Sequence, residues 1–458
     1  MKEQSKIKVG QSIKIDINGM AHEGQGVGRI NGMAVFVEGA LKGEKVKARV
    51  DKVARNYAIA HAESILEPSP ERTTPPCPYA ERCGGCMLQH LSYKGQLEFK
   101  TQKVRDSLER IGHIQTVVHD TIGMPEPWRY RNKAQYPVGE DKGQAVLGFY
   151  EKRTHNIVPS GSCMIQNEFS DKVAGIVKEW ADRYHVPIYN EIKHKGLLRH
   201  VVTRVGIKTG EVMAILVVNG SKIPYEQELI ELLQHRIRGF KSLILNINDK
   251  KTNVILGEKN TVIFGSPYIY DYIGDIKFGL SPLSFFQVNP VQVEVLYNKA
   301  LEYAGLTGEE TVIDTYCGIG TITLFLARKA KKVYGIEIVK PAVEDARHNA
   351  QINGIANVEF IHGAAEEVMP QLLEKGIKAD VIVMDPPRRG CDQKLLEAAI
   401  GMSPRTIVYV SCNPATLARD LRFLEDHGYK AEEVQPVDMF PHTYHVECVV
   451  SLKRKPIT

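Results

Sequence analysis

The sequence predicts an α/β protein with three parts: a small N-terminal β-barrel, a mixed α+β middle domain and a C-terminal open sheet that is mostly parallel. Two observations carry this prediction. Glycine-punctuated β-like runs fill residues 7–66, whereas β-like and helical segments alternate regularly from about residue 292 onward. The length of 458 residues agrees with several domains, because single hydrophobic cores stop growing at about 250–300 residues.

The N-terminal segment is predicted to form a barrel of about five short strands. Residues 1–66 carry 11 Lys/Arg against 7 Asp/Glu, and therefore most of the formal net charge of +5. Small barrels commonly bind oligonucleotides, and a basic barrel fits a polyanion. The charge favours RNA or DNA as a partner, with a merely solubilising surface as the alternative.

The middle of the chain begins with the polar, Pro-rich linker "EPSPERTTPPCP" (67–78). Near-helical spacing of Leu97, Val104, Leu108 and Ile111 then predicts one amphipathic helix over 93–114. Residues 125–280 are mixed: the β-like runs are 144–151, 200–208, 211–220 and 242–248, and the helical patterns are 168–184 and 224–236.

The composition is ordinary for a globular protein, with 43% hydrophobic and 25% charged residues. No stretch reaches the roughly 18 consecutive apolar residues of a membrane helix, and the polar N-terminus has no apolar signal core. We therefore expect a cytoplasmic protein with no membrane partner. In that reducing compartment, its eight cysteines indicate metal binding or catalysis rather than disulfides.

The C-terminal part alternates strands and helices in the order of a sheet covered on both faces. The predicted strands are 311–314, 332–337, 358–363, 379–385, 406–411 and 447–453. The predicted helices are 320–330, 340–354, 365–376, 391–402 and 414–428. Ligands of such sheets bind beyond the carboxyl ends of the strands, so the loops that follow the strands are where a site is expected.

Two of these loops predict a binding site for an adenosine-containing cofactor. In "DTYCGIGTIT" (314–323), Gly318 and Gly320 let the backbone approach a ligand closely. Glu337 ends the next strand, where its carboxylate can accept hydrogen bonds from ribose hydroxyls. A dinucleotide fingerprint needs a third glycine where this chain has Thr323, so S-adenosylmethionine is favoured over NAD.

Two further loops at the same edge carry reactive groups. Asp385 is followed by two stiffening prolines, Cys412 directly follows a predicted strand, and Glu447 precedes the last apolar run. A thiol and a carboxylate in one site suit methylation of a pyrimidine carbon: a thiolate adding to C6 makes C5 nucleophilic, and a base then removes the C5 proton. Cys412 is the predicted nucleophile and Glu447 the predicted base; the alternative is a buried thiol and a capping carboxylate. An amino-directed methyltransferase is disfavoured, because such enzymes often carry an aromatic residue where this chain has Arg388.

The motifs "SFFQVNP", "DTYCGIGT", "MDPPRRG", "SCNPATLARD" and "DMFPHTYHVECV" occur in this order over the C-terminal part. Together they resemble the RNA uracil-C5 methyltransferase family, and the resemblance extends over nearly the whole chain. It implies a Rossmann-like class I methyltransferase domain in which Cys412 is the nucleophile and Glu447 the proton acceptor. It further implies S-adenosylmethionine contacts from Gln287, Tyr316, Glu337 and Asp385. Gln287 and Asp385 are also expected near the target base, which flips out of its stack and packs on Phe285.

The resemblance also implies how the chain is divided. Residues 1–66 resemble the OB-like TRAM module that binds RNA. Residues 67–92 and 125–280 form the middle domain, and residues 93–124 join 281–458 in the methyltransferase domain. Of the family's RNA substrates we expect 23S ribosomal RNA, because the transfer-RNA branch generally lacks the barrel and the cysteine cluster; a transfer-RNA enzyme is the alternative. A monomer with no obligate protein partner is expected.

A cysteine cluster precedes the predicted helix at 93–114. Cys77, Cys83 and Cys86 stand on one Gly-rich loop, and Cys163 is the candidate fourth ligand outside the catalytic domain. The spacing admits zinc or iron–sulfur, while the family resemblance, through "CGGCMLQH", implies a 4Fe–4S cluster that braces the middle domain.

Basic residues in the middle domain predict contacts to RNA. In "WRYRNK" (128–133), an extended backbone would set Arg129, Arg131 and Lys133 on one face. The segment "KHKGLLRH" (193–200) is a second basic patch. A solvated surface is the alternative for each.

Overall fold

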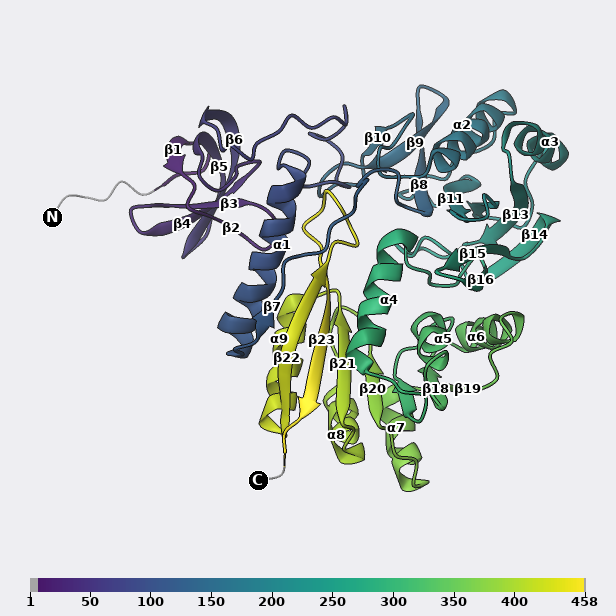
Figure 1. Ribbon diagram of the computed structural model, residues 1–458. Helices are drawn as coiled ribbons and strands as arrows, with labels where there is room; N and C mark the ends of the chain where they lie inside the picture. Colours follow the sequence, from purple (N-terminus) through teal and green to yellow (C-terminus); the bar gives the residue numbers. More distant parts are fainter. Residues whose placement is uncertain (1–6, 457–458) are drawn as a thin grey trace.

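The largest sheet of the computed structural model, which describes residues 7–456, has eight strands in the order β19-β18-β17-β20-β21-β23-β22-β7 (Figure 1). Five strands are parallel: β17 (Thr311–Asp314), β18 (Lys332–Glu337), β19 (Val358–His362), β20 (Val381–Met384) and β21 (Thr406–Ser411). The antiparallel β23 (Glu447–Arg454) lies between β21 and β22 (Tyr429–Val437). The predicted parallel sheet is confirmed, while β22 was not predicted.

Helices cover both faces of this sheet because its strands are apolar on both sides. Val312 belongs to one buried cluster, whereas the adjacent Ile313 belongs to a second cluster on the opposite face of the sheet. The helices are α4 (Pro290–Ala304), α5 (Thr321–Ala327), α6 (Lys340–Ile352), α7 (Ala365–Glu374), α8 (Gln393–Met402) and α9 (Pro414–Asp426). Asn-Pro pairs start α4 and α9, where the asparagine side chain caps the helix and the proline fits its first turn.

The helix predicted at 93–114 is α1 (Tyr93–Ser107), and a π-helical turn, η1 (Leu108–Gly112), follows it. Val104 and Leu108 are buried as the spacing predicts, whereas Ile111 is 52% exposed because the wider π turn breaks the α-helical register. After this turn, β7 (Val117–Val118) pairs with β22. This segment therefore packs on the C-terminal sheet, although it precedes the middle sheet in sequence.

The N-terminal part is a six-stranded sheet in the order β1-β5-β6-β4-β3-β2. Its strands are β1 (Ser12–Asp16), β2 (Gly19–Met20), β3 (Gly26–Ile30), β4 (Met33–Glu38), β5 (Lys45–Val53) and β6 (Tyr57–Glu67). Period-two burial along β1 and β5 places aliphatic side chains such as Ile15 and Val46 in a small core of its own. The predicted barrel region is thus all-β, with β2 as an additional two-residue strand.

The middle sheet has seven strands in the order β10-β9-β8-β11-β12-β13-β14. They are β8 (Lys133–Asp141), β9 (Gln144–Tyr150), β10 (Ile157–Pro159), β11 (Leu198–Val205), β12 (Val212–Val218), β13 (Phe240–Ile247) and β14 (Lys259–Gly265). The helices α2 (Glu168–Arg183) and α3 (Glu226–Arg236) cover one face of it, where Trp180 is fully buried. The β-like runs and both helical patterns expected here are present.

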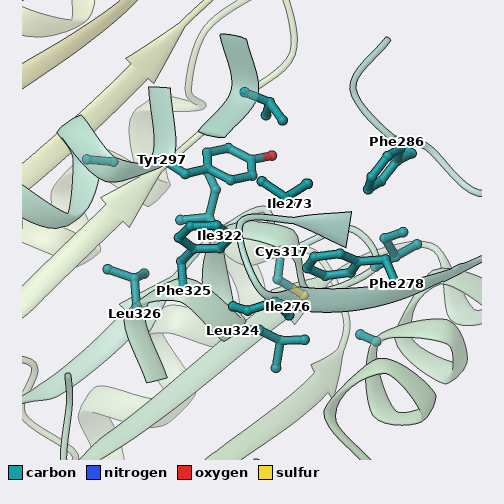
Figure 2. Close-up of a cluster of buried hydrophobic side chains, with 14 of the residues drawn as sticks. Ile273, Ile276, Phe278, Phe286, Tyr297, Cys317, Ile322, Leu324, Phe325 and Leu326 are labelled. Carbon is teal, nitrogen blue, oxygen red and sulfur yellow. The ribbon is translucent and has the colours of Figure 1, made fainter. Parts of the chain in front are cut away.

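The other face of the middle sheet shares a core with the C-terminal sheet. The hairpin of β15 (Ile269–Ile273) and β16 (Ile276–Leu280) lies between them, and Ile215 of β12 belongs to the same buried cluster as Phe325 of α5. Figure 2 shows hairpin residues of this core beside α5, with Cys317 pointing into it near Phe278. The middle sheet is therefore anchored directly beside the strands that carry the site.

Among the described residues, no helix is long and apolar enough to cross a membrane.

Candidate active site

The loops predicted to carry the site leave the same edge of the C-terminal sheet. Asp314 ends β17, Glu337 ends β18, and Asp385 and Cys412 follow β20 and β21. Because these four strands are parallel neighbours, their carboxyl ends meet at one edge. The structure thus brings together side chains that are up to about a hundred residues apart in sequence.

The glycine loop after β17 has the backbone geometry of a ligand cradle. Gly318 has φ +55° and Gly320 has φ +87°, a left-handed conformation that favours glycine. A Cβ added at Gly318 would meet no atom within 4 Å, so the backbone there faces open space. The amide of Gly318 donates to Oε2 of Glu337 at 3.0 Å and the amide of Val339 donates to Oε1 at 2.7 Å, which fixes that carboxylate beside the loop.

Two further predicted cofactor contacts lie on different segments, and their role stays a prediction. Tyr316 stands on the glycine loop itself and is partly buried. Gln287 is buried on the segment between β16 and α4. Its main-chain carbonyl accepts a hydrogen bond from Asn132 Nδ2 at 3.0 Å. Phe285, on the same segment, is 71% exposed, so its ring is open to contact with a ligand.

Arg204 was not predicted as a site residue, yet it holds the segment that carries Phe285 and Gln287. Its guanidinium is buried, and Nη2 donates to the carbonyls of Pro282, at 3.3 Å, and of Ser284. The sequence offers no signal for this role, because Arg204 lies in β11 of the middle sheet and reads as one basic residue within an apolar strand.

The predicted nucleophile and base lie near each other where β21 and β23 meet. The ladder between these strands ends at the pair Ser411–Cys448, so Cys412 is the first residue beyond it on one strand and Glu447 is the neighbour of Cys448 on the other. The charge of Glu447 acts on the Cys412 thiol, in agreement with this placement. Cys412 is half-buried and Glu447 is buried, in contrast to Cys317, which lies in the core (Figure 2).

The charged groups of the site act on one another. Burial raises the pKa of the Cys412 thiol to about 11; Glu447 and Asp385 add to the rise, while the Arg388 guanidinium opposes it. Burial and Asp385 also raise the pKa of Glu447 well above its ordinary value, again against Arg388. Burial, followed by repulsion from Asp314, raises the pKa of Asp385 to about 7. Two carboxyls with raised pKa values beside a thiol form an arrangement that can transfer protons near neutral pH.

Arg388 is held close to the thiol by the loop that carries Cys412. Its carbonyl accepts hydrogen bonds from Asn413 Nδ2 at 3.1 Å and from Thr416 Oγ1 at 3.2 Å. Its side chain is exposed and lines a cavity of about 1470 Å³. Arg388 therefore acts on Cys412 and Glu447 and also lines the cavity, whereas those two residues are not among the residues that line it.

The cavity is bordered by every part of the chain. The barrel contributes His61 and its neighbours, the cysteine segment contributes Cys77, Cys83 and Cys86, and the catalytic loops contribute Phe285 and Arg388. Further lining residues are Arg131, Lys133, Cys163, Tyr444 and His445. Its size and its mixture of basic and aromatic side chains suit a single-stranded nucleic-acid segment.

Residues 128–133, predicted to present three basic side chains on one face, do not have an extended backbone throughout. Arg129 has φ +54° and turns its guanidinium to the carbonyls of Cys163, at 2.7 Å, and Gln166, at 3.1 Å, and to the Asp171 carboxylate at 2.8 Å. Arg131 and Lys133 do line the cavity. The predicted extended backbone is thus wrong at Arg129, whose contacts fix the loop of Cys163, while RNA contact by Arg131 and Lys133 stays a prediction.

The four cysteines of the predicted cluster gather at one side of the cavity with free thiols. Burial raises the pKa of Cys86 to about 12, and the neighbouring thiols of Cys163, Cys83 and Cys77 add to that rise. Four thiols are a donor set suited to an iron–sulfur cluster. Among the described residues, however, no group of three or more His, Cys, Asp or Glu side chains is placed to hold a metal ion.

The sheet order, the glycine cradle with its fixed acid, and the reactive groups beside it define the class of protein as a class I methyltransferase that uses S-adenosylmethionine. Comparisons with known proteins agree with this assignment. A family model described as tRNA (Uracil-5-)-methyltransferase matches residues 224–455, and a TRAM domain model matches residues 6–62. The chain belongs to the RNA uracil-C5 methyltransferase family.

Relatives extend this similarity over the full chain. An uncharacterized RNA methyltransferase of Caldanaerobacter subterraneus subsp. tengcongensis is 58% identical over 450 residues, which cover 98% of this chain and 100% of the relative. One from Clostridium tetani is 53% identical and covers 98% of each chain. The crystal structure of Pyrococcus abyssi tRNA (uracil-54, C5)-methyltransferase in complex with S-adenosyl-L-homocysteine superposes with a TM-score of 0.77 at 30% identity, and the match covers 96% of this chain and 99% of that one.

Proposed function

We propose that this RNA methyltransferase transfers a methyl group from S-adenosylmethionine to C5 of uridine, through a covalent bond between Cys412 and C6 of the base. The ladder between β21 and β23 carries the proposal, because it ends at Ser411–Cys448, next to both Cys412 and Glu447. Gly318, whose backbone faces open space at the same edge of the sheet, is the proposed donor cradle. Phe285, exposed on the neighbouring segment, is proposed to stack on the flipped uracil. The proposed contacts to the methyl donor S-adenosylmethionine are Gln287, Tyr316, Gly318, Gly320, Glu337 and Asp385.

The proposed reaction begins with loss of the thiol proton. A carboxylate whose pKa is raised is a stronger proton acceptor, so Asp385, with a pKa of about 7, suits this step. The Cys412 thiolate then forms a bond to C6, and the C5–C6 π electrons move onto C5 and O4. The positive charge of Arg388 favours this thiolate.

The second half of the reaction transfers the methyl group and frees the enzyme. Bound S-adenosylmethionine supplies an electrophilic methyl group on a sulfonium. C5 takes that methyl group while the bonding electron pair stays on the sulfur that it leaves. Glu447 then removes the C5 proton, the electron pair restores the C5–C6 double bond, and the Cys412 thiolate is expelled. One proton is released for each methyl group transferred.

The substitution Cys412→Ala tests this proposal. The variant should bind S-adenosylmethionine normally, transfer no methyl group to RNA, and form no covalent complex with 5-fluorouridine RNA. Cys391→Ala is a matched control, because Cys391 is also a thiol but is buried in the core; it should keep both activities. Normal turnover by Cys412→Ala would overturn the mechanism.

For the substrate we propose 23S ribosomal RNA, held by the barrel (1–66) and the middle domain through Arg131 and Lys133. Transfer RNA is the second candidate, because the Pyrococcus abyssi protein that covers 96% of this chain is named for transfer RNA. A match of that extent includes the barrel, so the barrel alone does not separate the two RNA classes. Mapping 5-methyluridine in both RNAs from cells with and without the protein decides between them.

We further propose that Cys77, Cys83, Cys86 and Cys163 hold a 4Fe–4S cluster with a bracing role. The gathering of four free thiols at one side of the cavity supports this. The iron and sulfide content of anaerobically purified protein, together with its visible absorbance, tests it. Stoichiometric zinc without sulfide would assign the site to a zinc ion instead.

A further inference from the structure

The loop 438–446 joins β22 to β23 and leads directly into Glu447, so we call it the base loop. It also borders the cavity, which Phe440, Thr443, Tyr444 and His445 line. The loop starts and ends at the Val437–Glu447 pair of β22 and β23, so its contacts act on the segment directly before Glu447. The residues that hold it come from segments distant in sequence.

One face of α1 contacts the base loop from Asp438, at the start of the loop, to Tyr444, near its end. Four residues form this face, and their spacing of three, four and three positions places them on one side of the helix: Tyr93, Gln96, Lys100 and Lys103. Tyr93 Oη donates to Asp438 Oδ2 at 2.9 Å, at the start of the loop. Lys103 Nζ donates to the carbonyl of Tyr444 at 2.9 Å and lies over its ring, near the end of the loop.

The middle of this helical face is buried although it is polar. Lys100 and Asp438 form an ion pair in which both side chains are fully buried. Lys100 Nζ also donates to the carbonyl of Phe440 at 3.1 Å, and the amide of Phe440 donates to Asp438 Oδ1 at 3.2 Å. Lys100 of α1 thus binds both Asp438 and Phe440, which lie in the first turn of the base loop.

His442 is a second anchor and has an uncommon backbone conformation, with φ +68°. Its amide donates to Gln96 Oε1 at 2.8 Å, and its carbonyl accepts from the amide of Leu88 at 3.0 Å. Gln96 Nε2 in turn donates to the carbonyls of Leu88, at 3.1 Å, and Leu91, at 2.9 Å. The ring of His442 stacks on Trp128, with centroids 3.7 Å apart. A strained residue persists when its surroundings over-determine it, and such residues cluster at functional sites.

We propose that the α1 face formed by Gln96, Lys100 and Lys103 is a positioning device for Glu447. This inference rests on the proposed function, because it assigns the device to the step in which Glu447 removes the C5 proton. The contacts of Leu88 and Leu91 extend the device to the cysteine segment, which ends at Cys86. The device couples the folding of that segment to the placement of the catalytic base.

The proposal predicts a defect in one step of the reaction only. Glu447 acts after the methyl group has moved, whereas Cys412 lies on a different loop and attacks first. A displaced Glu447 should therefore leave attack and methyl transfer intact and should slow release of the product. The covalent RNA–protein complex would then accumulate on ordinary uridine RNA, where the intact enzyme resolves it.

Gln96→Met is the test variant, because methionine keeps the length of the side chain and removes its hydrogen bonds. Gln102→Met is its matched control: it is the same substitution on the same helix, at an exposed glutamine whose side chain donates a hydrogen bond to Asp106 and none to the base loop. Glu447→Gln gives the benchmark for a lost base. For each variant, the covalent complexes with uridine RNA and with 5-fluorouridine RNA are measured beside turnover.

We expect Gln96→Met to lower kcat by roughly 10- to 100-fold, since a misplacement of about 1 Å can cost about a hundredfold. It should form the 5-fluorouridine complex within threefold of the unmodified protein and accumulate the uridine complex as Glu447→Gln does. Unchanged turnover, or a parallel loss of both complexes, would overturn the proposal. Should Gln96→Met not fold, Lys103→Met carries the same test from a partly exposed position.

Failure of the proposed function would look different. The unmodified protein would then form no complex with 5-fluorouridine RNA at all, whatever the state of α1. If the unmodified protein forms the 5-fluorouridine complex but Gln96→Met accumulates no uridine complex, only the positioning role is rejected.

Discussion

Replacement of Asp385 by asparagine should stabilise the protein at alkaline pH while it abolishes methyl transfer. Burial raises the pKa of Asp385 from an ordinary value of 3.8 to about 7 in the folded protein. Each pKa unit corresponds to about 1.4 kcal/mol, so the ionised carboxylate costs the fold up to about 4 kcal/mol. Because the side chain is partly open to solvent, screening reduces our expected value to about 2 kcal/mol.

The pH dependence has a definite sign. Well below the ordinary pKa of 3.8 the carboxyl is protonated in both the folded and the unfolded chain, so it adds no cost. Between that pKa and pH 7 the unfolded chain ionises while the folded one resists, and the cost grows until it is complete above about pH 7. Asp385→Asn should therefore exceed the unmodified protein in stability by about 2 kcal/mol at pH 8 and by about 1 kcal/mol at pH 4.5.

Urea-induced unfolding at the two pH values measures this difference. Asp120→Asn serves as the control, because the Asp120 side chain is 97% exposed, and its stability should stay within about 0.5 kcal/mol of the unmodified protein at either pH. An equal effect of Asp385→Asn at pH 4.5 and pH 8 would refute the reasoning. A gain in stability with a loss of activity is typical of a group kept for function at the expense of the fold.

Three further outcomes are expected. The rate of methyl transfer should rise with pH through about 7, because Asp385 must lose its proton to act as a base. In Arg388→Met the pH at which the Cys412 thiol is alkylated should move higher, since that guanidinium holds down the pKa of Cys412, and an alkylation profile that does not move contradicts this role. Gly318→Ala should weaken S-adenosylmethionine binding, measured by calorimetry, because φ +55° strains any side chain by about 1–2 kcal/mol; unchanged affinity would count against the cradle. Phe285→Ala should raise the KM for RNA by roughly 5- to 150-fold, as expected for about 1–3 kcal/mol of base stacking, and leave thermal stability unchanged because the ring is exposed.

The C-terminal fold could be predicted because its signals are local. Short apolar runs followed by Gly, Asp-Pro-Pro or Ser-Cys-Asn mark strand ends, and parallel order brings those ends together. β22 escaped prediction because "YKAEEVQPV" is charged in its first half, and its burial comes from pairing with β23 and β7. A strand of this kind is decided by tertiary neighbours and not by its own composition.

The contacts that hold the site were not predictable for a related reason. Lys100 and Gln96 read as the polar side of an amphipathic helix, yet they are buried because Asp438, Phe440 and His442 satisfy them. Partners more than three hundred residues away leave no mark on local periodicity. Arg129 is a similar case. It was predicted to contact RNA, but its left-handed backbone directs its guanidinium to the carbonyl of Cys163.

The site gathers three ionisable groups, Cys412, Glu447 and Asp385, whose pKa values are all raised by burial. Each is neutral more of the time than it would be in water, so the resting site carries little negative charge beside the donor. The same burial strengthens Asp385 and Glu447 as proton acceptors and the Cys412 thiolate as a nucleophile once the thiol proton is removed. Arg388 acts in the opposite direction on Cys412 and Glu447 and lines the cavity where RNA is proposed to enter. An RNA phosphate that engaged Arg388 would weaken its influence on both groups, so substrate binding itself can tune the proton transfers that the reaction requires.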